Sequence, residues 1–249
     1  MDLAEMERRE VARARLRSAV QKAQRTSVAF PHEFIKADDG RPPLARLVHG
    51  GRGGAVRLRL YLCITMMATS APYDLQRPPT GSTWCRLLGL PEDGGPRRVT
   101  SNLKWLADAR LISLTRRWGG PPAITLLDPA GTGAPYVRPL GRYVGVPAEL
   151  WENGWLLDLS PTALALLLVL LERQGGQSEP QYVTRHRRDL YGLSPDTWTK
   201  ARKELEGQGL LTVRRVPQGS DFDYQRLRNT YWVELSRLKL PSTPLGSLV

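Results

Sequence analysis

Two segments of the chain carry side chains whose type and spacing suit hydrogen bonding to nucleic-acid bases. Residues 97–109 and 196–208 each place apolar side chains at helical spacing, which predicts two helices with one face in a core. The core positions are Val99, Leu103 and Leu106 in the first segment and Trp198, Ala201 and Leu205 in the second. The polar positions that face outward or sideways are Arg97, Arg98, Thr100, Ser101, Asn102 and Lys104, and Thr197, Thr199, Lys200, Arg202 and Lys203. Arg can donate two hydrogen bonds to guanine, and Asn can pair with adenine, so both helices carry groups that can read DNA bases.

Further basic side chains stand at matching places around these two segments. A short helix predicted over residues 184–191 carries Arg185, His186, Arg187 and Arg188. Arginine pairs follow the long helices as Arg116 and Arg117, and as Arg214 and Arg215, with Arg226 and Arg228 further along. We expect these side chains to bind phosphates, which position a protein on DNA, and Arg226 and Arg228 could also enter a minor groove. Trp118 has two interpretations, a contact with a base or partner, or packing on its own hairpin.

The overall charge agrees with a polyanionic partner. The 249 residues include 36 Lys and Arg against 24 Asp and Glu, which gives a formal net charge of +12 and a pI near 10.2. A folded chain this basic usually binds DNA, RNA or an acidic membrane surface. Hydrophobic residues make up 41% of the chain, enough for ordinary cores.

No sequence pattern argues for catalysis, a cofactor or a metal. The chain has neither a P-loop nor a dinucleotide-binding glycine motif, and the glycines at 50–54 are predicted to form a flexible hinge. The three histidines are far apart and lack neighbouring ligands at metal-binding spacing. We therefore expect a protein that is not an enzyme and that holds no metal. Cys63 and Cys85 are predicted to be buried thiols, as in a reducing cytoplasm.

An internal repeat organises most of the chain. Each copy has an apolar helix, a short helix ending at glycine, a third helix, and two strands. The first copy places them at residues 56–69, 83–88, 97–109, 112–117 and 123–127, and the second at 161–173, 184–191, 196–208, 211–216 and 230–235. Leu106 to Ile112 aligns without a gap on Leu205 to Leu211, and Leu88-Gly89-Leu90 matches Tyr191-Gly192-Leu193.

The second copy resembles the winged helix-turn-helix superfamily. Residues 194–211 are similar to its recognition helix and first wing strand, with a Leu seven residues after Trp198 and the step Gly209-Leu210-Leu211 into the strand. The first copy departs from this pattern at residues 92–95 and at Arg110, which replaces the glycine before the wing. The resemblance implies an α+β fold, mainly helical with small β-hairpin wings, built as tandem winged helix-turn-helix domains. It is shared with plasmid replication initiators and tandem-domain regulators.

The domain plan follows from the repeat. We expect an N-terminal charged helix and irregular arm at 1–50, a first domain at 51–128, a linker at 129–142 and a second domain at 143–249. The N-terminal helix, over residues 1–25, is either a solvated surface helix or an arm that contacts phosphate or a second protomer. Its thin apolar stripe consists of Leu3, Met6, Leu16 and Val20. Trp151 and Trp155 are predicted to lie in a core or at a domain contact, with their segment packed on the second copy.

Several functions remain open at this stage. The leading hypothesis is a non-enzymatic, sequence-specific reader of double-stranded DNA, most simply a transcriptional regulator, with two half-sites about one helical turn apart. An alternative is a replication initiator that binds origin repeats and recruits replication machinery. A third is a protein–protein interaction module, and RNA binding is a fourth. No apolar run reaches the roughly 18 residues of a membrane span, and the charged N-terminus favours the cytoplasm, associated with the nucleoid. A homodimer through the N-terminal helix is a further possibility.

Overall fold

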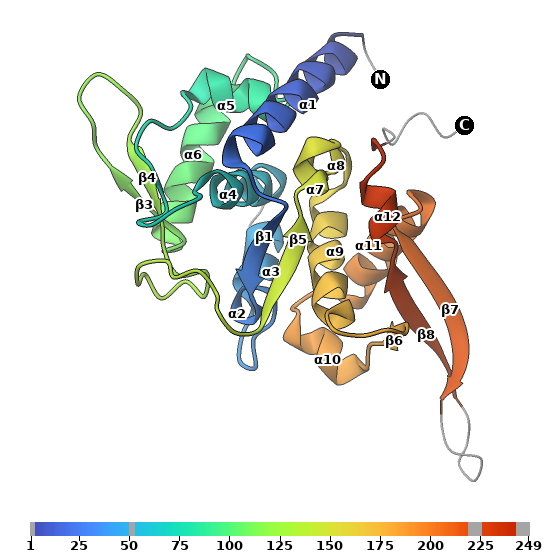
Figure 1. Ribbon diagram of the computed structural model, residues 1–249. Helices are drawn as coiled ribbons and strands as arrows, with labels where there is room; N and C mark the ends of the chain where they lie inside the picture. The colour runs from blue at the N-terminus through green and yellow to red at the C-terminus, as the bar shows by residue number, and fades with distance from the viewer. Residues whose placement is uncertain (1–2, 50–52, 219–225, 243–249) are drawn as a thin grey trace.

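The computed structural model describes residues 3–49, 53–218 and 226–242, and it is an α+β fold with three small antiparallel sheets (Figure 1). Elements of the first part are α1 (Leu3–Ala23), β1 (Ser27–Pro31), α2 (His32–Ile35), α3 (Pro43–His49), α4 (Gly54–Met67), β2 (Asp74–Leu75), α5 (Gly81–Leu87), α6 (Gly95–Asp108), β3 (Ile112–Thr115) and β4 (Ala123–Leu126). Those of the second are β5 (Tyr143–Pro147), α7 (Glu149–Glu152), α8 (Trp155–Asp158), α9 (Pro161–Gln174), β6 (Gln181–Tyr182), α10 (Arg185–Leu190), α11 (Pro195–Gly207), β7 (Leu211–Gln218), β8 (Arg226–Val233) and α12 (Leu235–Leu238).

The repeat is present in three dimensions and is longer than the sequence predicts. Two three-stranded sheets have the same strand order, β2-β4-β3 and β6-β8-β7. Strands β2 and β6 are two residues each and were not predicted. The repeat also begins earlier, because β1, α2 and α3 precede α4 as β5, α7 and α8 precede α9. We call β1 to β4 the first half and β5 to β8 the second half.

Matching backbone conformations support this correspondence. Gly89 and Gly192, which end the short helices, have φ of +63° and +62°. Before the hairpins, Arg110 has φ of +58° where Gly209 has +69°. The left-handed conformation is unfavourable for residues other than glycine. Arg110 adopts it nevertheless, so the two halves share the turn geometry although only the second has the glycine. The predicted third helices and most strand boundaries agree with the structure to within two residues. The second hairpin is the exception, because β7 and β8 reach Gln218 and Arg226, inside the expected loop.

Strands β1 and β5 pair antiparallel at the junction of the two halves. Their register joins Ser27 to Pro147 and Pro31 to Tyr143, with Ala29 opposite Gly145 at the centre. Pro31 and Pro147 end equivalent strands, so the pairing maps onto itself when the halves are exchanged. This is the arrangement of a two-fold axis, within one chain. Figure 1 shows its effect, with the β3–β4 hairpin and the β7–β8 hairpin at opposite corners and α5 and α10 at opposite ends.

One face of helix α1 is buried in the hydrophobic core. Ala12, Leu16 and Val20 are buried, whereas Leu3 and Met6 are exposed, so the predicted apolar stripe is wrong at its first two positions. The interpretation as a solvated surface helix does not hold for Arg9 and Arg13, which reach both oxygens of the buried Asp158 at 2.9 and 2.6 Å. The helix therefore belongs to the core of the protein that the structure describes.

The segment between the copies packs on both halves. Trp151 and Trp155 are fully buried, which confirms the predicted core role. The Trp155 indole donates to the carbonyls of Leu238 and Leu240 at 3.2 and 3.0 Å. Because β5 pairs with β1 and α7 contacts α1, the prediction that this segment packs on the second copy alone is incomplete. Cys63 and Cys85 are free and buried, as predicted.

One hydrophobic cluster continues through both halves, and polar contacts cross it. Arg59 of α4 donates to the carbonyls of Leu157 and Leu159, at 2.7 and 3.2 Å, so the first half caps backbone groups of the second. Among the described helices, none combines the length and apolarity that crossing a membrane would need.

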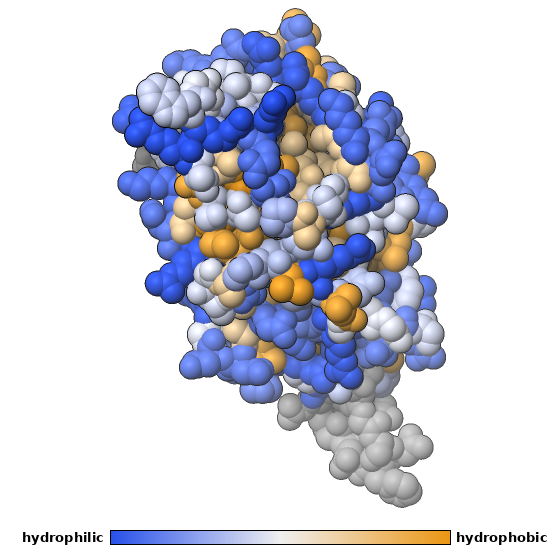
Figure 2. All heavy atoms as spheres, turned by 60° about the vertical axis from the view of Figure 1, so that its left-hand side comes forward, coloured by the Kyte–Doolittle hydropathy of each residue, from blue (hydrophilic) through white to orange (hydrophobic). Residues whose placement is uncertain are grey.

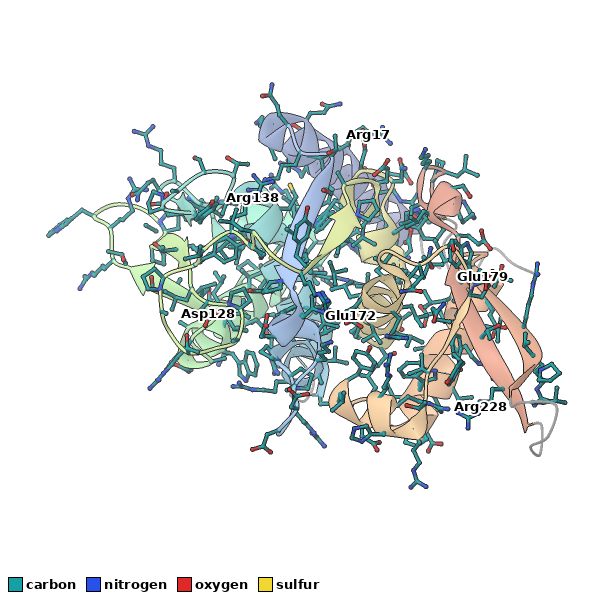
Figure 3. All side chains as sticks on the ribbon, turned by 60° about the horizontal axis from the view of Figure 1, so that its bottom comes forward. Arg17, Asp128, Arg138, Glu172, Glu179 and Arg228 are labelled. Atoms are coloured by element: carbon teal, nitrogen blue, oxygen red, sulfur yellow. The ribbon has the colours of Figure 1, made fainter. Side chains whose placement is uncertain are left out.

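A buried carboxylate of the second half also binds side chains of the first half. Glu172 of α9 lies 2.9 Å from His32 Nδ1 and 3.1 Å from Lys36 Nζ, and it accepts a hydrogen bond of 2.6 Å from Tyr191. Figure 3 places Glu172 between the β1–α2 segment and α9. Burial acts to raise the pKa of this carboxyl, but the Tyr191 hydrogen bond and the charges of Lys36 and His32 outweigh it and lower the pKa below its ordinary value of 4.5.

We therefore predict a specific acid sensitivity. A carboxyl with a lowered pKa stabilises the fold above its unfolded-state pKa, and this contribution is lost as pH falls through the folded-state value. Glu172→Gln should lower stability at pH 7 by about 1–3 kcal/mol and should reduce the loss of stability between about pH 5 and pH 3. Urea unfolding across this pH range measures both effects. Glu179→Gln, on an exposed loop, is the matched control; equal acid profiles for the native protein and Glu172→Gln would contradict the assignment.

Packing at the start of α4 gives a second prediction. A Cβ added at Gly54 would lie 2.5 Å from the carbonyl oxygen of Val48, whereas one added at Gly207 of α11 would meet no atom within 4 Å. Gly54→Ala should destabilise by about 1–3 kcal/mol through overpacking. Gly207→Ala should instead stabilise by up to about 1 kcal/mol, as expected of a helical glycine. Urea midpoints of the two variants test this opposite sign, and a more stable Gly54→Ala protein would refute the close approach.

Candidate nucleic-acid interface

Helices α6 and α11 start in similar ways and present basic side chains. Pro96 and Pro195 occupy the first turns, and Thr100 and Thr199 donate to their carbonyls at 3.0 and 2.9 Å. Ser194 caps α11 by accepting from the Thr197 amide at 3.2 Å. The exposed predicted residues on these helices are Arg97, Arg98, Thr100, Ser101 and Lys104 on α6, and Thr199, Lys200 and Lys203 on α11. Thr197 and Arg202 are half-buried.

The structure overturns the prediction for Asn102. This side chain is buried and bridges two groups, accepting from Arg57 Nε at 3.0 Å and donating to the Arg98 carbonyl at 2.6 Å. Asn102 occupies the place of Ala201 on α11, a place assigned from the sequence to Leu103, which is half-buried. Arg57, also buried, stacks over the Trp105 ring at 4.5 Å, and burial lowers the pKa of its guanidinium. A polar residue on a basic helix was assigned outward, but a buried arginine holds it inside.

On the inner side of α11, the corresponding contact with the preceding long helix is made by a carboxylate. Glu204 of α11 accepts from the Ser160 amide at 2.7 Å and from its hydroxyl at 2.5 Å, so it binds the N-terminus of α9. An acidic group at this end of a helix is favourable, because the helix dipole is positive there. Trp198 is buried in the second-half core. These contacts orient α11 and leave its opposite face exposed.

A basic cleft lies between α10 and the second hairpin, β7–β8. Its volume is about 420 Å³, and four arginines line it with Thr184, Asn229 and Tyr231. The four are Arg185, Arg188, Arg215 and Arg228. Arg188 lies over the Trp198 ring at 5.7 Å, and Arg228 over Tyr182 at 5.3 Å, which limits where both guanidinium groups can point. No carboxylate is among the cleft's described lining residues, so the cleft suits an anion such as phosphate.

Further basic residues of this region are exposed and lie outside the cleft lining or at its edge. Arg185 and Arg187 are exposed on α10, and Arg214 and Arg215 are exposed on β7. Figure 3 labels Arg228, which lies on strand β8 of this hairpin. The side chain of Arg226 lies outside the described part of the structure. Tyr182, on the short strand β6, was missed, since two residues of strand carry too little pattern to be recognised.

The first hairpin, β3–β4, has a different surface. Arg116 is exposed, and Arg117 donates to the carbonyl of Gln76, which fixes it against its own sheet. Trp118 is fully exposed, so the interpretation in which it packs on the hairpin is wrong. Figure 2, turned toward this half, shows a mostly hydrophilic surface broken by separate apolar patches.

The predicted basic residues thus form two groups, one in each half. Four arginines of the second-half group line the cleft, while the first-half group consists of the exposed face of α6 and the tip of the first hairpin. Within the described ranges, no three His, Cys, Asp or Glu side chains gather as metal ligands would. Comparison of the chain with protein-family models, curated proteins and solved structures finds no match.

The Asn102 bridge yields a prediction that separates folding from binding. Asn102→Ala leaves the buried Arg57 Nε without its acceptor, so stability should fall by about 1–3 kcal/mol. Ser101→Ala, on the neighbouring exposed position, should change stability by less than about 0.5 kcal/mol. Chemical denaturation of both variants provides the measurement. An Asn102→Ala protein of native stability that had lost nucleic-acid binding would restore the original assignment as a base contact.

Proposed function

We propose that this protein is a sequence-specific reader of double-stranded DNA, without catalytic activity, whose two halves are winged helix-turn-helix domains. The single observation that carries the proposal is the second-half cleft, where four arginines and no described carboxylate meet between α10 and the second hairpin. In a winged helix, these two elements flank the recognition helix, which here is α11. Phosphate bound in the cleft would place α11 in the adjoining major groove.

The topology supports the winged-helix assignment in both halves. From α4 in the first half and from α9 in the second, the order is helix, strand, helix, helix, strand, strand, and the first strand of this run, β2 or β6, pairs with the last, β4 or β8. This is the arrangement in which a three-helix unit carries a hairpin wing. Helix α6 exposes Arg, Lys, Ser and Thr side chains and α11 exposes Lys and Thr, which are groups that donate hydrogen bonds to base edges.

The two-fold pairing of β1 and β5 sets the form of the expected DNA site. Reading helices related by a two-fold axis bind segments of opposite orientation, as the two subunits of a homodimer do. Because α6 and α11 carry different side chains, the two segments should differ in base sequence. We therefore propose an inverted but unequal pair of half-sites, about one helical turn, or roughly 34 Å, apart.

The proposed biological role is transcriptional regulation, in the cytoplasm and associated with the nucleoid. Two winged helices in one chain fit a replication initiator equally well, since both roles need the same reading surfaces. They differ in where the DNA sites lie: promoters for a regulator, and an array of repeats beside its own gene for an initiator. The positions of the bound DNA sites therefore also decide whether the protein contacts the transcription or the replication machinery.

Selection of bound fragments from the source genome, at about 150 mM salt, tests the proposal, because non-specific phosphate contacts are weak there. The expected result is one enriched motif with two segments. Arg97→Ala with Arg98→Ala should relax base preference in one segment only, and Lys200→Ala with Lys203→Ala in the other, by about 1–3 kcal/mol for each lost base contact. Arg185→Ala with Arg215→Ala should weaken binding to all sequences and reduce the salt dependence by about one unit of slope per contact.

The matched control is Arg17→Ala, an exposed arginine of α1 outside both groups (Figure 3). It should leave the motif and the salt dependence unchanged. Absence of an enriched sequence, with binding lost at this salt, would refute sequence-specific reading and favour a protein-interaction module. A single short segment protected in footprinting would refute the use of both halves.

A further inference from the structure

Trp118 differs from the other tryptophans in its surroundings. Its side chain is 104% exposed, on the turn between β3 and β4. The remaining indoles are buried or half-buried: Trp84, Trp105, Trp151, Trp155, Trp198 and Trp232. Tryptophan has the largest apolar surface of the side chains, and its full exposure to water brings no stability to the fold. The residue therefore calls for a role outside folding.

The hairpin holds this indole at its tip. Arg117, next to it, is bound to the Gln76 carbonyl of the same sheet. Gly119 follows in the left-handed region, with φ of +67°, and supplies the turn that a side-chain-bearing residue would resist. Pro121 and Pro122 then restrict the backbone on the return to β4. The indole is presented by a constrained turn rather than by a long free loop.

The charge around the tip of the first hairpin indicates which kind of molecule Trp118 contacts. Residues 109–127 contain three arginines and no acidic residue. The exposed Arg116 lies two positions away, and the hairpin exposes no second large apolar side chain. Protein interfaces bury about 800 Å² on each partner around an apolar core, so a lone indole among arginines is a poor start for one. An aromatic ring flanked by cations instead suits a nucleic-acid strand, since bases stack on the ring while phosphates meet the arginines.

We propose that Trp118 contacts DNA, with its indole wedged against bases in the minor groove beside the segment read by α6, and with Arg116 on a flanking phosphate. Apolar side chains that enter the minor groove in this way partly unstack base steps and bend the duplex. The inference rests on the proposed function and assigns the first hairpin a different contact from the second, whose Arg215 and Arg228 line the cleft. The first half thus adds a stacking contact where the second half adds charge.

The test uses the full chain and an end-labelled, mixed-sequence duplex of about 40 base pairs, which is long enough for two half-sites a helical turn apart. A salt concentration of about 50 mM allows phosphate contacts to bind it without a known site. Label anisotropy reports affinity. Subtracting the fluorescence spectrum of Trp118→Phe from that of the native protein gives the emission of Trp118. This emission should be quenched and shifted to shorter wavelength when the duplex binds.

Three variants complete the design. Trp118→Ala should weaken binding about tenfold, as expected from the loss of one stacking contact. Trp118→Phe retains a ring and should stay within about threefold of the native affinity. Leu140→Ala removes another exposed apolar side chain, 93% exposed and outside both hairpins in sequence, and should have no effect.

The outcomes distinguish this inference from the proposed function. If the duplex binds but neither the Trp118 emission nor the affinity of Trp118→Ala changes, the Trp118 contact is refuted and DNA binding stands. If the native protein does not bind the duplex at all, both are refuted. Self-association in sedimentation that Trp118→Ala abolishes, without any effect on duplex binding, would overturn the inference in favour of a protein contact.

Discussion

The central constraint of this structure is the antiparallel pairing of β1 with β5. Val28, Phe30, Val144 and Val146 alternate along these strands and are buried, so a shift of either strand by one residue would turn its two buried side chains toward solvent. Ala29 and Gly145 face each other at the centre, where small side chains suit the crossing of an axis. Since the same helices follow each strand, this register determines how the two three-helix units are placed.

The two halves share a scaffold but not its chemistry. At one equivalent position, Glu204 binds the N-terminus of α9, whereas Trp105 stacks on the buried Arg57 of α4. The second half has an arginine-lined cleft; the first half has an arginine tied to its own sheet and an exposed indole. Helix α1, which has no counterpart in the second half, covers part of α5. The symmetry therefore belongs to the backbone, and the surfaces have become different.

The sequence predicts best those elements whose pattern lies within a short stretch of the chain. The third helices were predicted because their buried residues recur at helical spacing, and Trp151 and Trp155 because their segment is too apolar to be solvated. Asn102 was misplaced because its partner, Arg57, lies 45 residues away and no local pattern reveals a buried arginine. The β1–β5 pairing was missed for the same reason, because the two strands lie more than a hundred residues apart along the chain.

The two-fold arrangement within one chain also changes the thermodynamics of assembly. In a homodimer, dilution separates the subunits, so the fraction with two reading surfaces depends on protein concentration. Here the halves are joined covalently and share one hydrophobic cluster, and their pairing is independent of dilution. Under the proposed function, occupancy of a DNA site would then rise with the first power of protein concentration rather than with the square. Each half can also acquire substitutions without imposing them on the other, a freedom that identical subunits encoded by one gene do not have.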